Sequence, residues 1–160
     1  MSKKIAVFPE PGAIGPAMNL VGICQGLREI GHDPVFVLEP GLKDTAASYG
    51  FEEHYVSCME PMSAEAQARY WDDFMIKYMP TFKTSAYEQI ATYVKGCWEA
   101  IIYTSEWSVK NGLDKVIAEI KPDLIIEAGT YKGGSAVLWA IILEHINPDG
   151  RVITIDINGF

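Results

Sequence analysis

The chain has 160 residues, the length of a single domain that can bury a sizeable core. Hydrophobic residues make up 49% and charged residues 21%, which is typical of a folded globular protein, and no apolar run is long enough for a transmembrane helix. A formal charge of −8 argues against nucleic acid and anionic membrane surfaces as partners, because both require a basic surface.

The N-terminal part alternates short apolar runs with helical patterns. The first run is followed by a breaker-rich loop and by a helix that begins at Pro16 and ends before Gly31. A shorter helix precedes Gly50. The predicted strands are 4–8, 34–38 and 54–57, and the predicted helices are 16–30 and 42–49.

The middle of the chain is helical and rich in aromatic residues. A helix is predicted from Ser63 to Tyr78, broken by Pro80, and helical spacing returns over 87–120 with interruptions near Gly96 and 111–112. The aromatic side chains either pack into a core or form a helical wall beside the strand ends. They are Tyr70, Trp71, Phe74, Tyr78, Phe82, Tyr87, Tyr93, Trp98, Tyr103 and Trp107.

The C-terminal part reads as strand, glycine-rich turn, helix and strand, at 123–127, 128–134, 135–145 and 151–157. Strands that alternate with helices predict a parallel sheet with right-handed crossovers. We therefore expect one Rossmann-like α/β domain over 1–160. Its doubly wound parallel sheet would have five strands in the order 3-2-1-4-5, with helices on both faces.

The most informative motif is this last unit. A strand ends at an acidic residue, Glu127, and is followed by a turn with glycines at 129, 133 and 134, and the next strand ends at Asp156. Such glycines let the backbone approach a nucleotide or nucleoside, and the second acid binds ribose hydroxyls. The alternative interpretation is a tight turn without a ligand, in which backbone N–H groups bind Glu127.

From residue 4 to about 126 the sequence resembles the N-terminal, acceptor-binding domain of GT-B-fold nucleotide-sugar glycosyltransferases. The resemblance rests on Ile5-Ala6-Val7-Phe8, Pro11-Gly12-Ala13-Ile14-Gly15, Gly31-His32-Asp33-Pro34 and Lys121-Pro122-Asp123-Leu124. It implies that Pro11, Gly12 and Gly15, together with Tyr131, lie against an acceptor. That family often has a histidine base directly after the loop glycine. Here Pro16 stands at that position and cannot take a proton, and a second, donor-binding domain is not expected.

From about 124 to 157 the sequence instead resembles S-adenosylmethionine-dependent methyltransferases of the cephalosporin-hydroxylase-like and rhamnosyl O-methyltransferase-like group. The matching stretches are Glu127-Ala128-Gly129-Thr130-Tyr131-Lys132-Gly133-Gly134-Ser135 and Asp149-Gly150-Arg151-Val152-Ile153-Thr154-Ile155-Asp156. The resemblance implies S-adenosylmethionine as cofactor. The residues that it implies at the cofactor are Glu127, Gly129, Thr130, Gly133, Gly134, Ser135 and Asp156.

The two resemblances meet in one strand, which suggests a chimera or truncated fusion with a glycosyltransferase-like part (1–122) and a methyltransferase-like part (123–160). Three functions stay open: an acceptor-binding half that is catalytically incomplete alone, a methyltransferase-type cofactor binder, and a non-catalytic engineered or structural domain. No catalytic residue is assigned. The scattered histidines and three unpaired cysteines predict no metal site and a cytoplasmic location.

Two placements follow from the predicted topology. The glycine-rich loops after strands one and four are expected to face each other at the switch point of the sheet and to form one ligand site. That site would be lined by Pro11, Gly12, Gly129, Thr130 and Tyr131, with Asp156 on its far side. The edge of strand five would be exposed, and a homodimer through that edge is the expected macromolecular contact.

Overall fold

The computed structural model describes residues 1–10, 14–61, 63–128 and 134–155. Its centre is a five-stranded, all-parallel sheet in the order β3-β2-β1-β4-β5, which confirms the predicted fold class and strand order. The strands are β1 (Lys4–Phe8), β2 (Asp33–Leu38), β3 (Glu52–Tyr55), β4 (Leu124–Ala128) and β5 (Arg151–Ile155).

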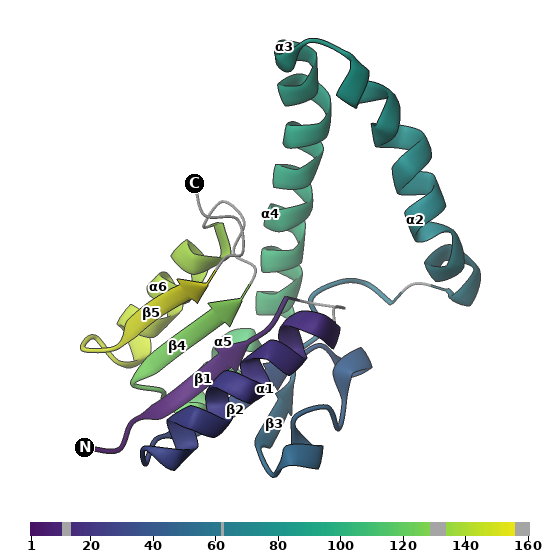
Figure 1. Cartoon of the computed structure of the whole chain (residues 1–160). Helices are drawn as coiled ribbons and strands as arrows, with labels where there is room; N and C mark the ends of the chain where they lie inside the picture. The colour runs from purple at the N-terminus through teal and green to yellow at the C-terminus, as the bar shows by residue number, and fades with distance from the viewer. Residues whose placement is uncertain (11–13, 62, 129–133, 156–160) are drawn as a thin grey trace.

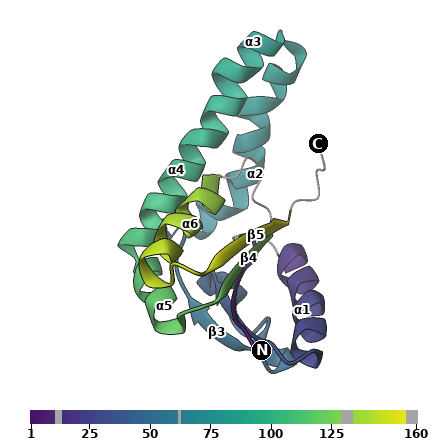
Figure 2. The ribbon, with the colours of Figure 1, turned by 90° about the vertical axis from the view of Figure 1, so that its left-hand side faces the viewer.

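Helices cover both faces of the sheet, as expected for a doubly wound fold. Helix α1 (Ile14–Glu29) lies on one face, and α5 (Leu113–Ile120) and α6 (Gly134–Ile146) lie on the other (Figure 2). Gly31 ends the α1 region with a φ of 89°, and Gly50 has a φ of 79°. Both glycines therefore adopt the left-handed conformation, which side chains disfavour.

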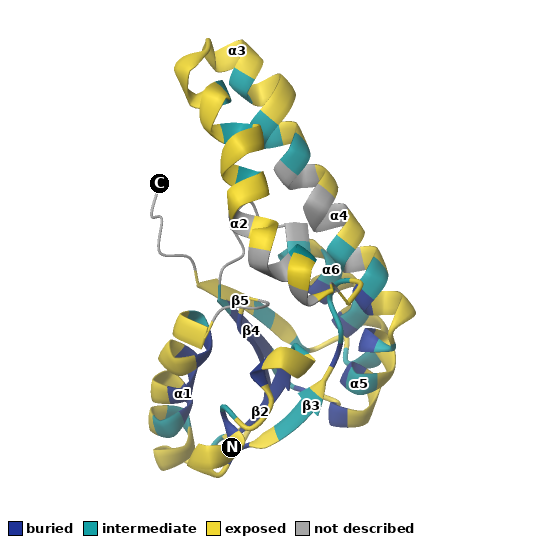
Figure 3. Cartoon of the chain, turned by 90° about the vertical axis from the view of Figure 1, so that its right-hand side faces the viewer, coloured by how far each residue is buried: buried dark blue, intermediate teal, exposed yellow. Residues whose placement is uncertain are grey.

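The sheet divides the core into two layers because successive strand residues point to opposite faces. Ile5, Val7 and Ile126 pack on the α1 side, whereas Ala6 and Ile125 pack on the side of α5 and α6. Figure 3 shows that the buried residues concentrate on β1, β2 and β4 and on the helix faces turned toward them. Burial on both faces explains why the central strands are continuous apolar runs.

A helical arm projects past the carboxyl-terminal ends of the strands (Figure 1). It comprises α2 (Ala64–Tyr78), a 3₁₀ turn (Met79–Lys83), α3 (Ala86–Gln89), a π-helical turn (Ile90–Val94) and α4 (Lys95–Lys110). The Ser63 hydroxyl accepts a hydrogen bond from the N–H of Ala66, and Ser85 forms a capping box with Glu88. These caps satisfy N–H groups that a helix start leaves free.

Aromatic rings hold the arm together near its tip. The rings of Phe74 and Tyr78 of α2 lie 6.3 and 5.5 Å, centroid to centroid, from that of Tyr93, and Phe82 lies 5.1 Å from it. The expected interruption near Gly96 corresponds to the π-helical turn, which ends at Val94, and Gly96 is the second residue of α4. A Cβ at Gly96 would lie 2.5 Å from the Tyr78 hydroxyl, so a glycine there lets α2 approach α4.

The segment predicted as a helix over 42–49 instead forms two 3₁₀ turns, Pro40–Leu42 and Ala47–Tyr49. The carboxylate of Glu53 accepts hydrogen bonds from the backbone N–H groups of Ala46 and Ala47, at 2.6 and 2.8 Å, and from that of Asp44. Because these N–H groups donate to Glu53, they cannot donate to the carbonyl groups of a helix. Asp44 also has a φ of 65°, which lies in the left-handed region. The third strand also begins two residues earlier than predicted, at Glu52.

Candidate functional site

The order in which successive strands are added to the sheet reverses between β1 and β4. From β1 the chain continues outward to β2 and β3, whereas β4 lies on the other side of β1 and continues to β5. Phe8, the last residue of β1, is in register with Glu127, so both strands end at the same level. The following helices, α1 and α6, leave toward opposite faces (Figure 2). This edge is the position at which open parallel sheets bind ligands.

Few of the predicted site residues fall in the part of the chain that the structure describes. Glu127 ends the apolar run of β4, Gly134 is the first residue of α6, and Ser135 follows it half-buried. Gly15 lies in the first turn of α1, and a Cβ there would meet nothing within 4 Å. The predicted residues outside the described ranges are Pro11, Gly12, Gly129, Thr130, Tyr131, Gly133 and Asp156.

Glu127 is the most unusual side chain at this edge, since it is only 5% exposed. Its Oε1 accepts a hydrogen bond of 2.8 Å from the indole N–H of Trp139 in α6. Its Oε2 is buried and has no hydrogen-bond partner among the described residues. A buried carboxylate oxygen without a donor is costly. Among the described residues this oxygen can therefore accept a further hydrogen bond, and the backbone N–H groups of 129–133 considered from the sequence lie outside the described ranges.

Trp139 was missed by the sequence analysis, although it organises this edge. Its indole stacks on Phe8 with ring centroids 4.1 Å apart and with 28° between the planes. It therefore connects β1, β4 and α6 through one side chain. The sequence pattern that could have pointed to Trp139 is a single tryptophan in a helix whose other apolar residues are aliphatic or alanine. A buried tryptophan usually has a hydrogen-bond partner, and Glu127 lies near the end of the preceding strand, β4.

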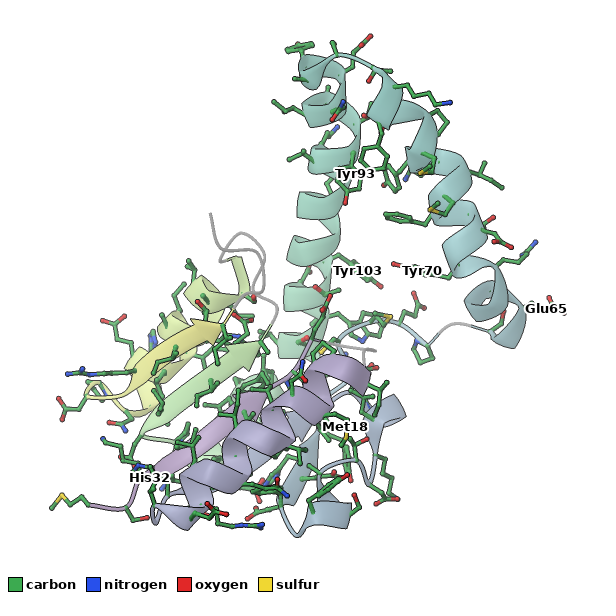
Figure 4. The ribbon with its side chains drawn as sticks, in the orientation of Figure 1. Met18, His32, Glu65, Tyr70, Tyr93 and Tyr103 are labelled. Carbon is green, nitrogen blue, oxygen red and sulfur yellow. The ribbon has the colours of Figure 1, made fainter. Side chains whose placement is uncertain are left out.

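Two tyrosines from the arm face each other above the same edge. In Figure 4, Tyr70 of α2 and Tyr103 of α4 point toward one another across the opening between the two helices. Both are about half-exposed, and Tyr103 stacks on Trp107 with ring centroids 6.1 Å apart. The described aromatic residues of the middle segment thus pack among themselves near the tip, and nearer the base Tyr70 and Tyr103 point toward each other. The side chains of Trp71 and Trp98 lie outside the described part.

The two cysteines whose side chains the structure describes, Cys24 and Cys58, do not add a reactive group. Burial raises the pKa of Cys58 to about 11 and that of Cys24 to about 12, so both thiols are protonated at neutral pH and are weak nucleophiles. Within the described ranges, no three His, Cys, Asp or Glu residues are grouped as a metal site would require. In the same ranges, no helix is both long and apolar enough to cross a membrane.

The fold is that of the N-terminal half of a GT-B glycosyltransferase. The spinosyn rhamnosyltransferase SpnG matches 96% of this chain with a TM-score of 0.57 and 14% identity, and CalG4, the calicheamicin glycosyltransferase, matches 98% with a TM-score of 0.56 and 14% identity. The chain covers 34% and 33% of those structures. At this identity the likeness concerns the fold alone.

Sequence comparison points to a different family for the C-terminal part. The family model Rhamnosyl O-methyltransferase/CmcI matches residues 107–159. The rhamnosyl O-methyltransferases of Mycobacterium bovis and Mycobacterium tuberculosis are 35% identical over 60 residues, which is 38% of this chain. The chain spans about a fifth of the length of these curated relatives. The match includes α5 as well as β4, α6 and β5, so it starts before the strand in which the two resemblances were expected to meet.

Proposed function

We propose that this chain binds a ring-bearing, hydroxylated acceptor at the carboxyl-terminal edge of β1 and β4, as the acceptor-binding half of a nucleotide-sugar-dependent glycosyltransferase. The observation that carries the proposal is that Tyr70 and Tyr103 point toward one another in the arm, which projects past the edge of the sheet at which Glu127 is buried. On this proposal residues 1–160 supply the acceptor site and not the whole catalytic centre, because Pro16 in α1 stands at the position of a proton-accepting histidine.

The ring-binding part of the site is formed by Tyr70 and Tyr103. Half-exposed tyrosines offer a large apolar face and a hydroxyl at little entropic cost, and rings of a ligand stack on them in offset or edge-to-face geometry. One structure of SpnG is a complex with the spinosyn aglycone, a precedent for an acceptor on this fold. Trp107, stacked on Tyr103, restricts the rotation of that ring and so prepares it for binding.

Glu127 supplies the polar part of the proposed site. Its free Oε2 accepts a hydrogen bond from a hydroxyl, and that bond removes the cost of a buried, unpaired acceptor. Trp139 holds the carboxylate through Oε1, so the free oxygen has a defined direction. A ligand without a donor at this position would leave the carboxylate unsatisfied, and a strongly anionic ligand would be repelled. The site therefore favours neutral or cationic ligands with a donor group.

The test is binding of spinosyn aglycone to the chain, measured by saturation-transfer NMR. We expect saturation of the ligand's ring protons, and about a tenfold loss of affinity in Tyr103→Ala, in line with roughly 1–1.5 kcal/mol for a ring contact. The matched control is Tyr87→Ala, because Tyr87 is 80% exposed and belongs to the arm tip. Equal affinity of Tyr103→Ala and the parent, or no saturation of the aglycone at all, contradicts the proposal.

A second candidate function is binding of S-adenosylmethionine. It is favoured by the family match over 107–159, which includes the glycine-rich segment between β4 and α6. Glu127 and Ser135 would then hold the methionine part of the cofactor, with Gly129, Thr130, Gly133, Gly134 and Asp156 as predicted from the sequence. A helix N-terminus beside the carboxylate suits a zwitterion.

Calorimetry with S-adenosylhomocysteine separates this candidate from the first. If the cofactor binds, Gly129→Val should abolish the heat of binding, because a branched side chain prevents close approach of the backbone, while the circular dichroism spectrum stays unchanged. Tyr103→Ala serves as the control, since it should weaken binding of the aglycone and leave the affinity for S-adenosylhomocysteine unchanged. If neither ligand binds, the third alternative remains, which is a non-catalytic structural chimera.

A further inference from the structure

Glu127 is a buried carboxylate without a counter-ion among the described residues. The ion pairs found in that part of the chain lie on β3 and α4, and none of them includes Glu127. The N–H group of Trp139 satisfies one carboxylate oxygen but brings no charge, because an indole is neutral. The N-terminus of α6 contributes about half a positive charge at most, so the site stays negative. A buried charge is costly unless an opposite charge is paired with it, and this carboxylate is therefore suited to a cation.

The surroundings of Glu127 are apolar. Phe8 of β1 is in register with Glu127, its ring stacks on Trp139, and both rings are more than nine-tenths buried. Ile125, two residues earlier on β4 and therefore on the same face of the sheet, belongs to the same core layer as these rings. The attraction between opposite charges rises as the effective dielectric constant falls. A cation therefore gains more at this carboxylate than at an exposed one.

Further carboxylates lie at the same edge of the sheet. Glu39 directly follows β2 with an extended backbone, φ −62° and ψ 138°, and Glu10 lies just beyond β1. An extended backbone continues the alternation of the strand, so Glu39 shares the sheet face of Val37. That face is the one covered by α5 and α6, and Glu127 lies on it too. Together these acids give the edge a negative potential, which attracts cations and repels anions before they make contact.

We propose that the acceptor of this site carries a protonated tertiary amine, whose N–H group donates a hydrogen bond to Oε2 of Glu127. The inference rests on the proposed function, because it assigns a chemical class to the same acceptor. In the described part of the chain, Oε2 is the one buried side-chain oxygen without a hydrogen-bond partner. A tertiary ammonium has a single N–H donor for that oxygen and alkyl groups for the apolar surroundings. A primary ammonium has three donors and would leave two of them unpaired there.

Two small ligands that share one ring test the charge. Benzyldimethylamine is a tertiary amine that is protonated at neutral pH, whereas benzyl alcohol offers a neutral O–H donor. Their dissociation constants are measured by NMR titration of the whole chain, following the indole N–H resonance that disappears in Trp139→Phe. We expect the amine to bind at least about tenfold more tightly than the alcohol, because hydrogen bonds to charged groups are the stronger ones. Equal affinities, or no binding of the amine, would overturn the inference.

Glu127→Gln tests the carboxylate itself. Glutamine keeps an oxygen for the Trp139 N–H group but removes the charge, so the affinity for benzyldimethylamine should fall at least about tenfold while that for benzyl alcohol changes little. The matched control is Glu29→Gln, which changes the net charge equally at the exposed end of α1, at the opposite edge of the sheet. An equal loss in both variants would indicate a general charge effect and would overturn the inference. If Glu127→Gln does not fold, the ratio of the two affinities in the parent decides.

Lys132→Gln addresses a counter-ion supplied by the chain itself. Lys132 lies outside the described ranges and is close to Glu127 in the sequence. We expect this variant to bind benzyldimethylamine with the affinity of the parent. A clear gain in affinity would show that the Lys132 ammonium occupies the carboxylate, and it would overturn the inference.

Competition identifies the source of the ammonium and separates this inference from the proposed function. Spinosyn aglycone should displace benzyldimethylamine, because both ligands would use the acceptor site. Displacement by S-adenosylhomocysteine and not by the aglycone would assign the carboxylate to the amino-acid end of that cofactor and would overturn the inference. If the aglycone binds and the amine does not, the proposed function stands without this inference, and if neither binds, both fail.

Discussion

Ile125→Ala should be among the most destabilising single substitutions in this chain, at about 2–5 kcal/mol. Ile125 is fully buried, and β4 is hydrogen-bonded to β1 on one side and to β5 on the other. Its side chain packs in the layer between the sheet and helices α5 and α6, so truncation removes buried apolar area and leaves a cavity. Urea unfolding followed by far-ultraviolet circular dichroism measures the change.

The matched control for this substitution is Ile76→Ala in α2. Ile76 is 74% exposed, so the same change in side chain should alter the free energy of unfolding by less than about 0.5 kcal/mol. A loss below about 1 kcal/mol for Ile125→Ala would mean that the strand behaves as an edge and that the sheet order does not hold in solution.

Trp139→Ala should cost about 3–5 kcal/mol, because it removes a large buried ring from the junction of β1, β4 and α6. Trp139→Phe separates the contribution of the ring to stability from that of its N–H group. It keeps a ring against Phe8 but leaves Oε1 of Glu127 without its donor, and a buried acceptor that loses its partner costs about 1–3 kcal/mol. Both variants are compared with the parent by urea unfolding.

Trp107→Phe is the matched control for the hydrogen bond. The indole nitrogen of Trp107 is buried and has no hydrogen-bond partner among the described residues. Removing that N–H group should leave stability unchanged or raise it, whereas the identical change at position 139 lowers it. Equal losses for the two phenylalanine variants would show that ring volume, and not the bond to Glu127, decides the effect.

Much of the fold could be predicted from local patterns. Continuous apolar runs, helical spacing and the glycine at 31 predicted the strands, most helices and the end of α1, and chain connectivity rules then gave the strand order. The helix predicted over 42–49 is an exception with a physical cause in a distant contact: Glu53 holds the backbone of 44–47 and prevents a helix there.

The candidate site was less accessible from the sequence. The position at the switch point follows from topology, and Glu127 was identified because it ends an apolar strand. Its bond to Trp139 was not predicted, since it joins two elements through side chains whose orientation depends on packing. The glycine-rich residues 129–133 lie outside the described ranges, so their role at the site stays a prediction.

By itself, the sequence determined the class of fold, the order of the strands and the acidic, glycine-rich end of β4, because these depend on periodicity and on residues close along the chain. The tertiary structure alone decided that Tyr70 and Tyr103 face each other, that one oxygen of Glu127 is buried without a hydrogen-bond partner among the described residues, and that β5 exposes Ile153 and Ile155. These features arise where helices from distant parts of the chain pack on the sheet or leave part of it uncovered, and no local pattern records such contacts.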